Sequence, residues 1–180
     1  MEKEEKPIPY HHDVVEFTTV AVRYCAFVEQ AALLEEREFV DTTLRLLPLL
    51  YLKASLLPGL DADETVDLET FVEEGDYNAV RSGVARVMGK DDDYLDVFVE
   101  EMRYSDRPIL KTISEDLADI YQDLRDYAET YRQGIEPIMT AAVARVRENF
   151  TTYWGQRLVN VMRALHDVRY NQQDNGDDNY

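Results

Sequence analysis

Three polar residues near the end of the chain could form one chemically active surface. Gln156, Asn160 and Arg163 recur at steps of four and three residues, so a helix places them on one face. The same stretch is otherwise rich in apolar residues, and polar groups in such a setting need hydrogen-bond partners. The favoured interpretation is a structural network that ties this helix to a neighbour, with Asp116 or Asp119 as the expected partner.

The same residues could instead line a ligand pocket. Trp154 would then form one wall, and His166 would lie further along the helix. His166 is favoured as a packed, hydrogen-bonded residue, because no Glu-x-x-His or His-Glu-x-x-His spacing accompanies it. Tyr104 and Asp106 fall in an irregular connection, where side chains are freer to serve function. The candidate binding residues are Tyr104, Asp106, Asp116, Asp119, Trp154, Gln156, Asn160, Arg163 and His166.

Four aspartates lie on one helix opposite its apolar stripe. They are Asp116, Asp119, Asp123 and Asp126, within a helix expected over residues 114–133. The favoured interpretation is that they form the solvent-facing side of this helix. The alternative is an acidic docking surface.

The sequence contains no motif that predicts a catalytic, metal or cofactor site. No phosphate loop, dinucleotide fingerprint or Gly-x-Ser-x-Gly elbow is present. His11 and His12 precede the first helix and are expected to be solvated. The aspartates at 91–93 lack the ligand spacing of a calcium loop and are interpreted as the start of a short helical turn over residues 94–98. The single cysteine, Cys25, excludes an internal disulfide and is expected to be buried. We therefore predict no metal and no cofactor.

The charge balance restricts the class of partner. Asp and Glu number 37 against 19 Lys and Arg, a net charge of −18. This charge opposes nucleic acids and anionic membranes and favours a protein partner with a basic surface. The late arginines are interpreted as partners of nearby carboxylates, and homodimerisation through an apolar face remains an alternative. These arginines are Arg145, Arg147, Arg157, Arg163 and Arg169.

Hydrophobic periodicity predicts an all-α fold. Helices are expected from Asp13, which with Glu16 resembles a capping box, and over residues 36–56, 76–88 and 114–133. One apolar phase crosses Gly155, so a single last helix of about 33 residues is expected after Pro137. Short connections favour an antiparallel bundle of about five main helices, the last one long, with short helical turns.

Gly155 lies in the middle of the long helix, where glycine is destabilising by about 1 kcal/mol relative to alanine. We expect a close approach by a backbone or a large ring at this position. A short extended piece at residues 68–72 has no convincing partner strand.

The length of 180 residues suits one domain. Residues 1–10 are expected to form a flexible lead-in, 11–170 the helical-bundle domain, and 171–180 a disordered acidic tail. The charged first residues lack the apolar core of a signal peptide, and no apolar run is long enough to span a membrane. The expected location is the cytoplasm.

Several strings in the second half resemble a bacterial family known as domain of unknown function 5063. They include Tyr104-Ser105-Asp106, residues 113–124, and Tyr153-Trp154-Gly155-Gln156 followed by Leu158-Val159-Asn160. The resemblance implies a compact, mainly helical cytoplasmic protein and supplies no activity for any residue. The favoured hypothesis is a non-catalytic interaction or regulatory protein with an acidic surface. The alternative is a small-molecule-binding protein or enzyme with a pocket around residues 154–166.

Overall fold

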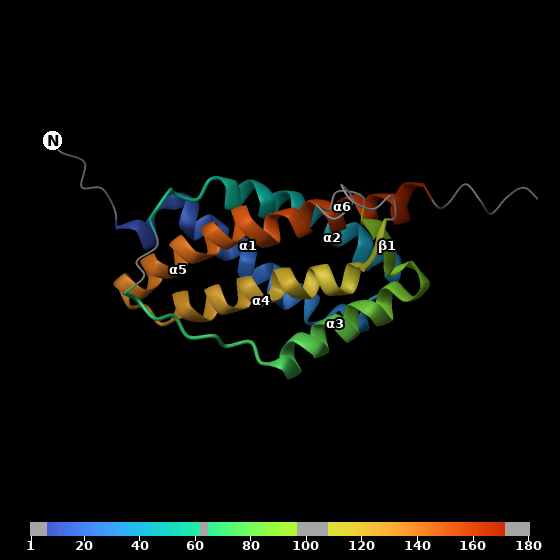
Figure 1. Ribbon diagram of the computed structural model, residues 1–180, viewed down its shortest axis with the longest axis horizontal. Helices are drawn as coiled ribbons and strands as arrows, with labels where there is room; N and C mark the ends of the chain where they lie inside the picture. The colour runs from blue at the N-terminus through green and yellow to red at the C-terminus, as the bar shows by residue number, and fades with distance from the viewer. Residues whose placement is uncertain (1–6, 62–64, 97–107, 172–180) are drawn as a thin grey trace, which may run out of the picture.

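The computed structural model describes residues 7–61, 65–96 and 108–171, and shows an elongated helical bundle (Figure 1). The mainly helical fold predicted from the sequence is confirmed. Within the described residues, no helix combines the length and the apolar character needed to cross a membrane. The main elements in chain order are α1 (His12–Val28), α2 (Glu36–Ser55), α3 (Glu74–Met88), β1 (Asp93–Asp96), β2 (Ile109–Thr112), α4 (Ile113–Arg132), α5 (Glu136–Asn149), the π-helix η5 (Phe150–Trp154) and α6 (Gly155–Tyr170).

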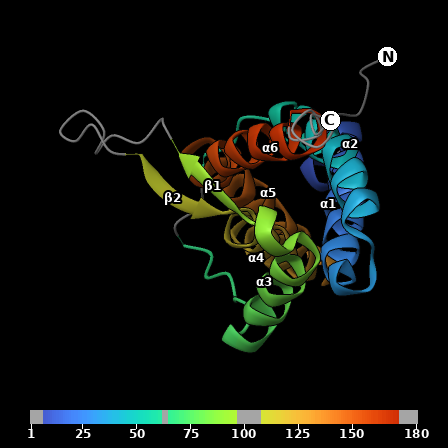
Figure 2. The same cartoon turned by 90° about the vertical axis from the view of Figure 1, so that its right-hand side faces the viewer.

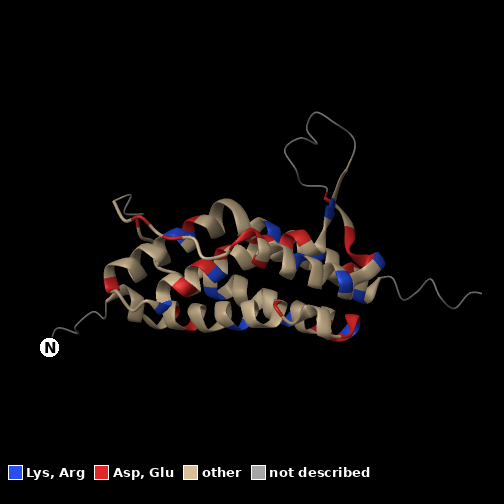
Figure 3. Ribbon diagram, turned by 90° about the horizontal axis from the view of Figure 1, so that it is seen from below, with Lys and Arg blue, Asp and Glu red and all other residues tan. Residues whose placement is uncertain are grey.

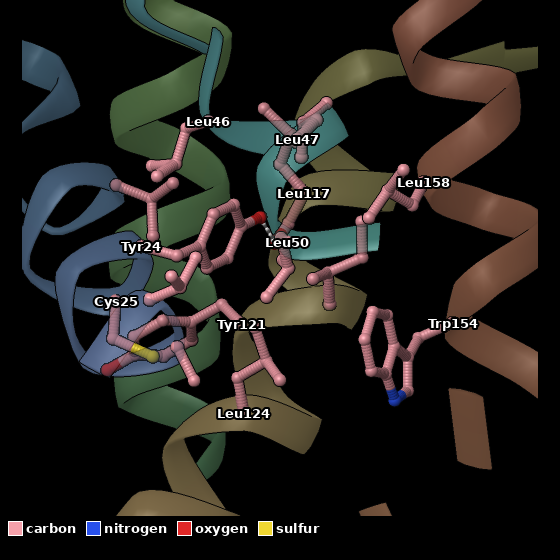
Figure 4. Close-up of a cluster of buried hydrophobic side chains, with 14 of the residues drawn as sticks. Tyr24, Cys25, Leu46, Leu47, Leu50, Leu117, Tyr121, Leu124, Trp154 and Leu158 are labelled. Carbon is pink, nitrogen blue, oxygen red and sulfur yellow. Dashed lines mark hydrogen bonds between the residues drawn. The ribbon is translucent and has the colours of Figure 1, made fainter. Parts of the chain in front are cut away.

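Helix α4 is the centre of the bundle. It packs against α1, α3, α5 and α6, which surround it when the molecule is viewed end-on (Figure 2). Most of its apolar stripe is buried, and Leu117 and Leu124 have no exposed surface. The Tyr24 hydroxyl on α1 donates a 2.8 Å hydrogen bond to the Leu117 carbonyl in this core (Figure 4). Burial of such large side chains is the main stabilising contribution to the bundle.

The helix ends follow the sequence signals in part. Gly89 and Gly134 have φ values of 54° and 73°, in the left-handed region where glycine is favoured, and both follow a helix as expected. Asp76 completes a capping box with Glu73 at the start of α3. The capping box predicted at Asp13 is wrong, because α1 already begins at His12 without a side-chain cap.

A β-hairpin replaces the helical turn predicted over residues 94–98. Strand β1 pairs antiparallel with β2, with Asp93 opposite Thr112 and Asp96 opposite Ile109. Exposure alternates along β1, since Leu95 is exposed whereas Asp96 is buried. The aspartates before it serve another helix: the Asp92 carboxylate accepts 2.7 Å bonds from both the amide and the hydroxyl of Ser114 at the start of α4. Residues 97–98 lie outside the described part.

The single long last helix is confirmed, with a π-helical segment inside it. Helices α5, η5 and α6 follow one another without a break from Glu136 to Tyr170. In η5 the Gly155 amide donates to the Phe150 carbonyl, five residues earlier. Phe150 and Trp154, at the two ends of this segment, both lie in the core.

Candidate functional site

The four aspartates of α4 face other elements of the bundle, so the prediction of a solvent-facing side is wrong. We call Asp116, Asp119, Asp123 and Asp126 the aspartate row. Each member accepts hydrogen bonds from a different part of the chain. The donors are Tyr94 on β1 for Asp116, Tyr77 on α3 and Arg157 on α6 for Asp119, Asn149 on α5 for Asp123, and the amides of Phe71 and Val72 before α3 for Asp126.

Burial changes the protonation of two members of the row. Asp116 is only 4% exposed, and desolvation raises its pKa to about 6 although the Tyr94 hydroxyl and the charge of Lys111 favour its ionised form. Desolvation likewise raises the pKa of Asp123 to about 6, against the amide bond from Asn149. The row therefore contains two carboxyl groups that titrate near neutral pH.

Asp119 is held as a full ion pair. It accepts a 2.6 Å bond from Nε of Arg157 and a 2.8 Å bond from the Tyr77 hydroxyl. The Arg157 guanidinium also lies 3.9 Å from the ring centre of Tyr153, a cation–π arrangement. Asp119 thus connects the long helix to α4 and α3, through Arg157 and not through the polar face singled out in the sequence.

The predicted polar face of α6 bonds to the β-hairpin. Gln156 donates to Asn160 (2.9 Å), Asn160 donates to the buried Asp96 (3.3 Å), and Arg163 donates to the carbonyl of Leu95 (2.8 Å). Asp96 also forms a 3.0 Å ion pair with Lys111 on β2. The side chains are therefore tied to a neighbouring element, but that element is β1 and not α4.

The Asn160→Ala variant should lose about 1–2 kcal/mol of unfolding free energy, because its amide links Gln156 to the buried Asp96. Urea denaturation would measure the loss. Gln156→Ala is the matched control, since Gln156 is exposed and its removal should change stability by less than about 0.5 kcal/mol. Equal effects of the two substitutions would contradict a network centred on Asn160.

The remaining predicted site residues do not gather around Trp154. Trp154 has no exposed surface and lies among the buried side chains of the core (Figure 4). Its indole nitrogen donates a 3.2 Å bond to the Val146 carbonyl. It therefore cannot form the wall of an accessible pocket. His166 is exposed and lies beside the ring of Tyr170. Tyr104 and Asp106 lie outside the described residues.

A cavity does lie along the aspartate row, between α4 and α5. Its volume is about 370 Å³. Two carboxylates from α4 and an arginine and an asparagine from α5 line it, together with the chain segment before α3. The lining residues are Leu68, Glu69, Thr70, Gln122, Asp123, Asp126, Tyr127, Thr130, Ala142, Arg145, Val146, Asn149 and Tyr153. Asp123, Asp126 and Arg145 can each be noticed in the sequence. A row of aspartates on a solvent-facing side, however, does not predict that they line one cavity.

Within the described part of the chain, the late arginines pair with carboxylates in two of the five cases. Arg157 pairs with Asp119, and Arg169 pairs with Asp41. Arg147 and Arg163 donate instead to backbone carbonyls. Among the described residues, the Arg145 side chain forms no ion pair or hydrogen bond, and it is exposed at the cavity.

In the ranges that the structure describes, one small group of residues has donor atoms close enough for a metal ion. Atoms of His12, Asp13 and Glu16 lie within 4.8 Å of one another in the first turns of α1. The Lys53 ammonium already contacts the Glu16 carboxylate, and the positive end of the helix dipole opposes a cation there. These contacts account for the cluster as a surface ion-pair group.

Comparison with known proteins places the whole described bundle within one family. The model of a family described as "Domain of unknown function (DUF5063)" matches residues 9–171. The crystal structure of protein BF1032 from Bacteroides fragilis is 44% identical, with 91% of this chain and 96% of that chain covered, at a TM-score of 0.80. No curated protein matches the sequence.

Proposed function

Since the chain belongs to the DUF5063 family, whose function is unknown, we propose a function from its own surface: a non-catalytic interaction module that binds a basic protein partner. The charge of the stretch that leads into the first turns of α3 supports this proposal. Residues 61–80 contain eight Asp and Glu and no Lys or Arg. A surface with one sign of charge attracts partners of opposite charge and repels others.

The described part of this segment is both exposed and held in place. We call residues 65–76 the acidic segment. Its carboxylates at Asp67, Glu69 and Glu74 are exposed, and Glu74 is the first residue of α3. Figure 3 marks Asp and Glu positions in red, including those on the coil that crosses the bundle. Asp126 on α4 holds the segment by accepting hydrogen bonds of 2.6 and 2.8 Å from the backbone amides of Phe71 and Val72. A held segment loses less conformational entropy on binding than a free one.

The proposal predicts a partner that is retained through the acidic segment. Immobilised wild-type protein should retain a basic protein from a cell extract at about 50 mM salt. It should release that protein at about 500 mM salt, because charges are then screened within a few ångströms. The double substitution Asp67→Lys and Glu74→Lys should weaken this binding about tenfold or more.

The matched control changes the same total charge elsewhere. Asp167→Lys and Glu38→Lys alter two exposed carboxylates on α6 and in the first turn of α2. This variant should retain the partner, and circular dichroism should show equal helicity for both variants. Equal loss of binding in the two variants, or no salt-sensitive partner for the wild type, would overturn the proposal.

A further inference from the structure

The cavity between α4 and α5 has the size of a small-metabolite site. Its volume of about 370 Å³ is at the lower end of the range for ligand pockets. The two helices lie side by side and meet at the loop that joins them, and the acidic segment passes along α4 (Figure 1). Residues 68–70 of that segment line the cavity together with α4, α5 and Tyr153 of η5.

The α4 side of the cavity carries two carboxylates, and one oxygen of each accepts hydrogen bonds from the protein. Asn149 donates to Oδ1 of Asp123 at 2.5 Å, and the amides of Phe71 and Val72 donate to Oδ1 of Asp126. In the part of the chain that the structure describes, only one fully buried side-chain oxygen or nitrogen has no partner, and it belongs to Glu36. The second oxygens of Asp123 and Asp126 are therefore accessible.

The α5 side offers a positive charge. Arg145 lines the cavity and lies more than 4.0 Å from every carboxylate oxygen in the described ranges, since it forms no ion pair there. With no carboxylate partner in the described ranges, Arg145 is available to an external anion. Its guanidinium suits a carboxylate group, which it can bind through two parallel hydrogen bonds.

Apolar side chains also line the cavity. Leu68, Ala142 and Val146 line the cavity together with the ring of Tyr127. They offer a surface for a short aliphatic group. The cavity thus combines an acidic wall, a basic wall and an apolar part within a volume suited to a small molecule.

From this arrangement we propose that the cavity binds a free aliphatic amino acid as its zwitterion. The ligand's ammonium group lies against Asp123 and Asp126, its carboxylate against Arg145, and its side chain against Leu68 and Val146. This proposal goes beyond the proposed basic partner and is tested separately, because the carboxylates changed in that test, Asp67 and Glu74, do not line the cavity.

The affinity should depend on pH through Asp123. The groups around it are Asp119 and Asp126 on α4, Arg157 on α6, and Glu69 and Arg145 at the cavity. A ligand ammonium favours the ionised carboxylate, which predominates above the Asp123 pKa of about 6. Binding should therefore weaken as the pH falls from 7.5 to 5.

Thermal unfolding in the presence of each of the twenty free amino acids tests the proposal. L-Leucine, L-isoleucine and L-valine should raise the melting temperature in a concentration-dependent way, since a ligand that binds only the folded state stabilises it. Isothermal titration should then give an affinity for L-leucine. Isoamylamine, which lacks the carboxylate, and 4-methylpentanoate, which lacks the ammonium, should each bind at least about tenfold more weakly.

Two substitutions separate the ligand contacts from a structural effect. Arg145→Gln should weaken L-leucine binding about tenfold without changing the melting temperature of the unliganded protein, because Arg145 has no partner in the described bundle. Asp123→Asn should weaken binding similarly and remove its pH dependence. Arg86→Gln, an exposed arginine on α3, is the control and should leave binding unchanged.

Several outcomes would overturn the proposal. The site is refuted if none of the twenty amino acids stabilises the protein. Isoamylamine binding as tightly as L-leucine would refute the zwitterion. An unchanged L-leucine affinity in the Arg145→Gln variant would show that the ligand's carboxylate does not bind Arg145. None of these results would affect the salt-sensitive retention of a basic protein.

Discussion

Gly155→Leu should lower the free energy of unfolding by about 3 kcal/mol or more, the upper range for overpacking. A Cβ atom built on Gly155 would lie 2.4 Å from the Phe150 carbonyl oxygen and 2.9 Å from the Phe150 ring. The backbone of η5 cannot move away easily, because Trp154 beside it is fully buried. For a protein of this size, the melting temperature should fall by about 6–12 °C.

Gly83→Ala is the matched control for this prediction. Its Cβ would lie 3.6 Å from the nearest atoms of Ala32, an ordinary van der Waals distance, in the middle of α3. Helix propensity then favours alanine by about 1 kcal/mol. Gly83→Ala should therefore raise the melting temperature, whereas Gly155→Ala should lower it. Two similar shifts in melting temperature would contradict the close packing at η5.

Asp116→Asn should stabilise the protein above pH 6, by up to about 3 kcal/mol for a pKa difference of about two units. The folded-state pKa of Asp116 is raised by burial from 3.8 to about 6. Between these values the unfolded state loses its proton first, so the stability of the wild type falls as the pH rises. Asparagine keeps an oxygen for Tyr94 and removes the charge.

Urea unfolding at half-unit steps from pH 4 to pH 8 would measure this effect. The difference between variant and wild type should grow from pH 4 to about 6.5 and then stay constant. Tyr94→Phe should have the opposite effect, because it removes the hydroxyl that favours ionised Asp116. Parallel stability curves for wild type and Asp116→Asn would show that the carboxyl group is not buried in this way.

Helical periodicity predicted most of the fold, because long apolar stripes leave few alternatives. The stripe of α4 and the continuous phase across Gly155 both correspond to buried faces. The hairpin was missed for a physical reason: four residues of alternation in β1 are too few to distinguish a strand from a turn. More than ten residues separate the end of β1 at Asp96 from the start of β2 at Ile109. No short turn motif between the two strands therefore indicates a hairpin.

The aspartate row shows why the site was harder to predict. On a helical wheel, four aspartates opposite an apolar stripe indicate a solvated face. Here α4 is enclosed on several sides, and Tyr77, Tyr94, Asn149 and Arg157 provide donors from distant parts of the chain. Nothing in the sequence pairs these donors with their acceptors. The residues of the cavity could therefore be noticed singly but not assembled.

The central place of α4 has a consequence for protein synthesis. Helices α1, α2 and α3 leave the ribosome before α4, yet the Tyr24 hydroxyl and much of the apolar surface of α1 and α3 are covered only when α4 is present. The amino-terminal half should therefore remain uncompacted during translation and expose apolar surface to chaperones. Stalled chains that end before residue 113 should be protease-sensitive, whereas chains that extend through α6 should become resistant.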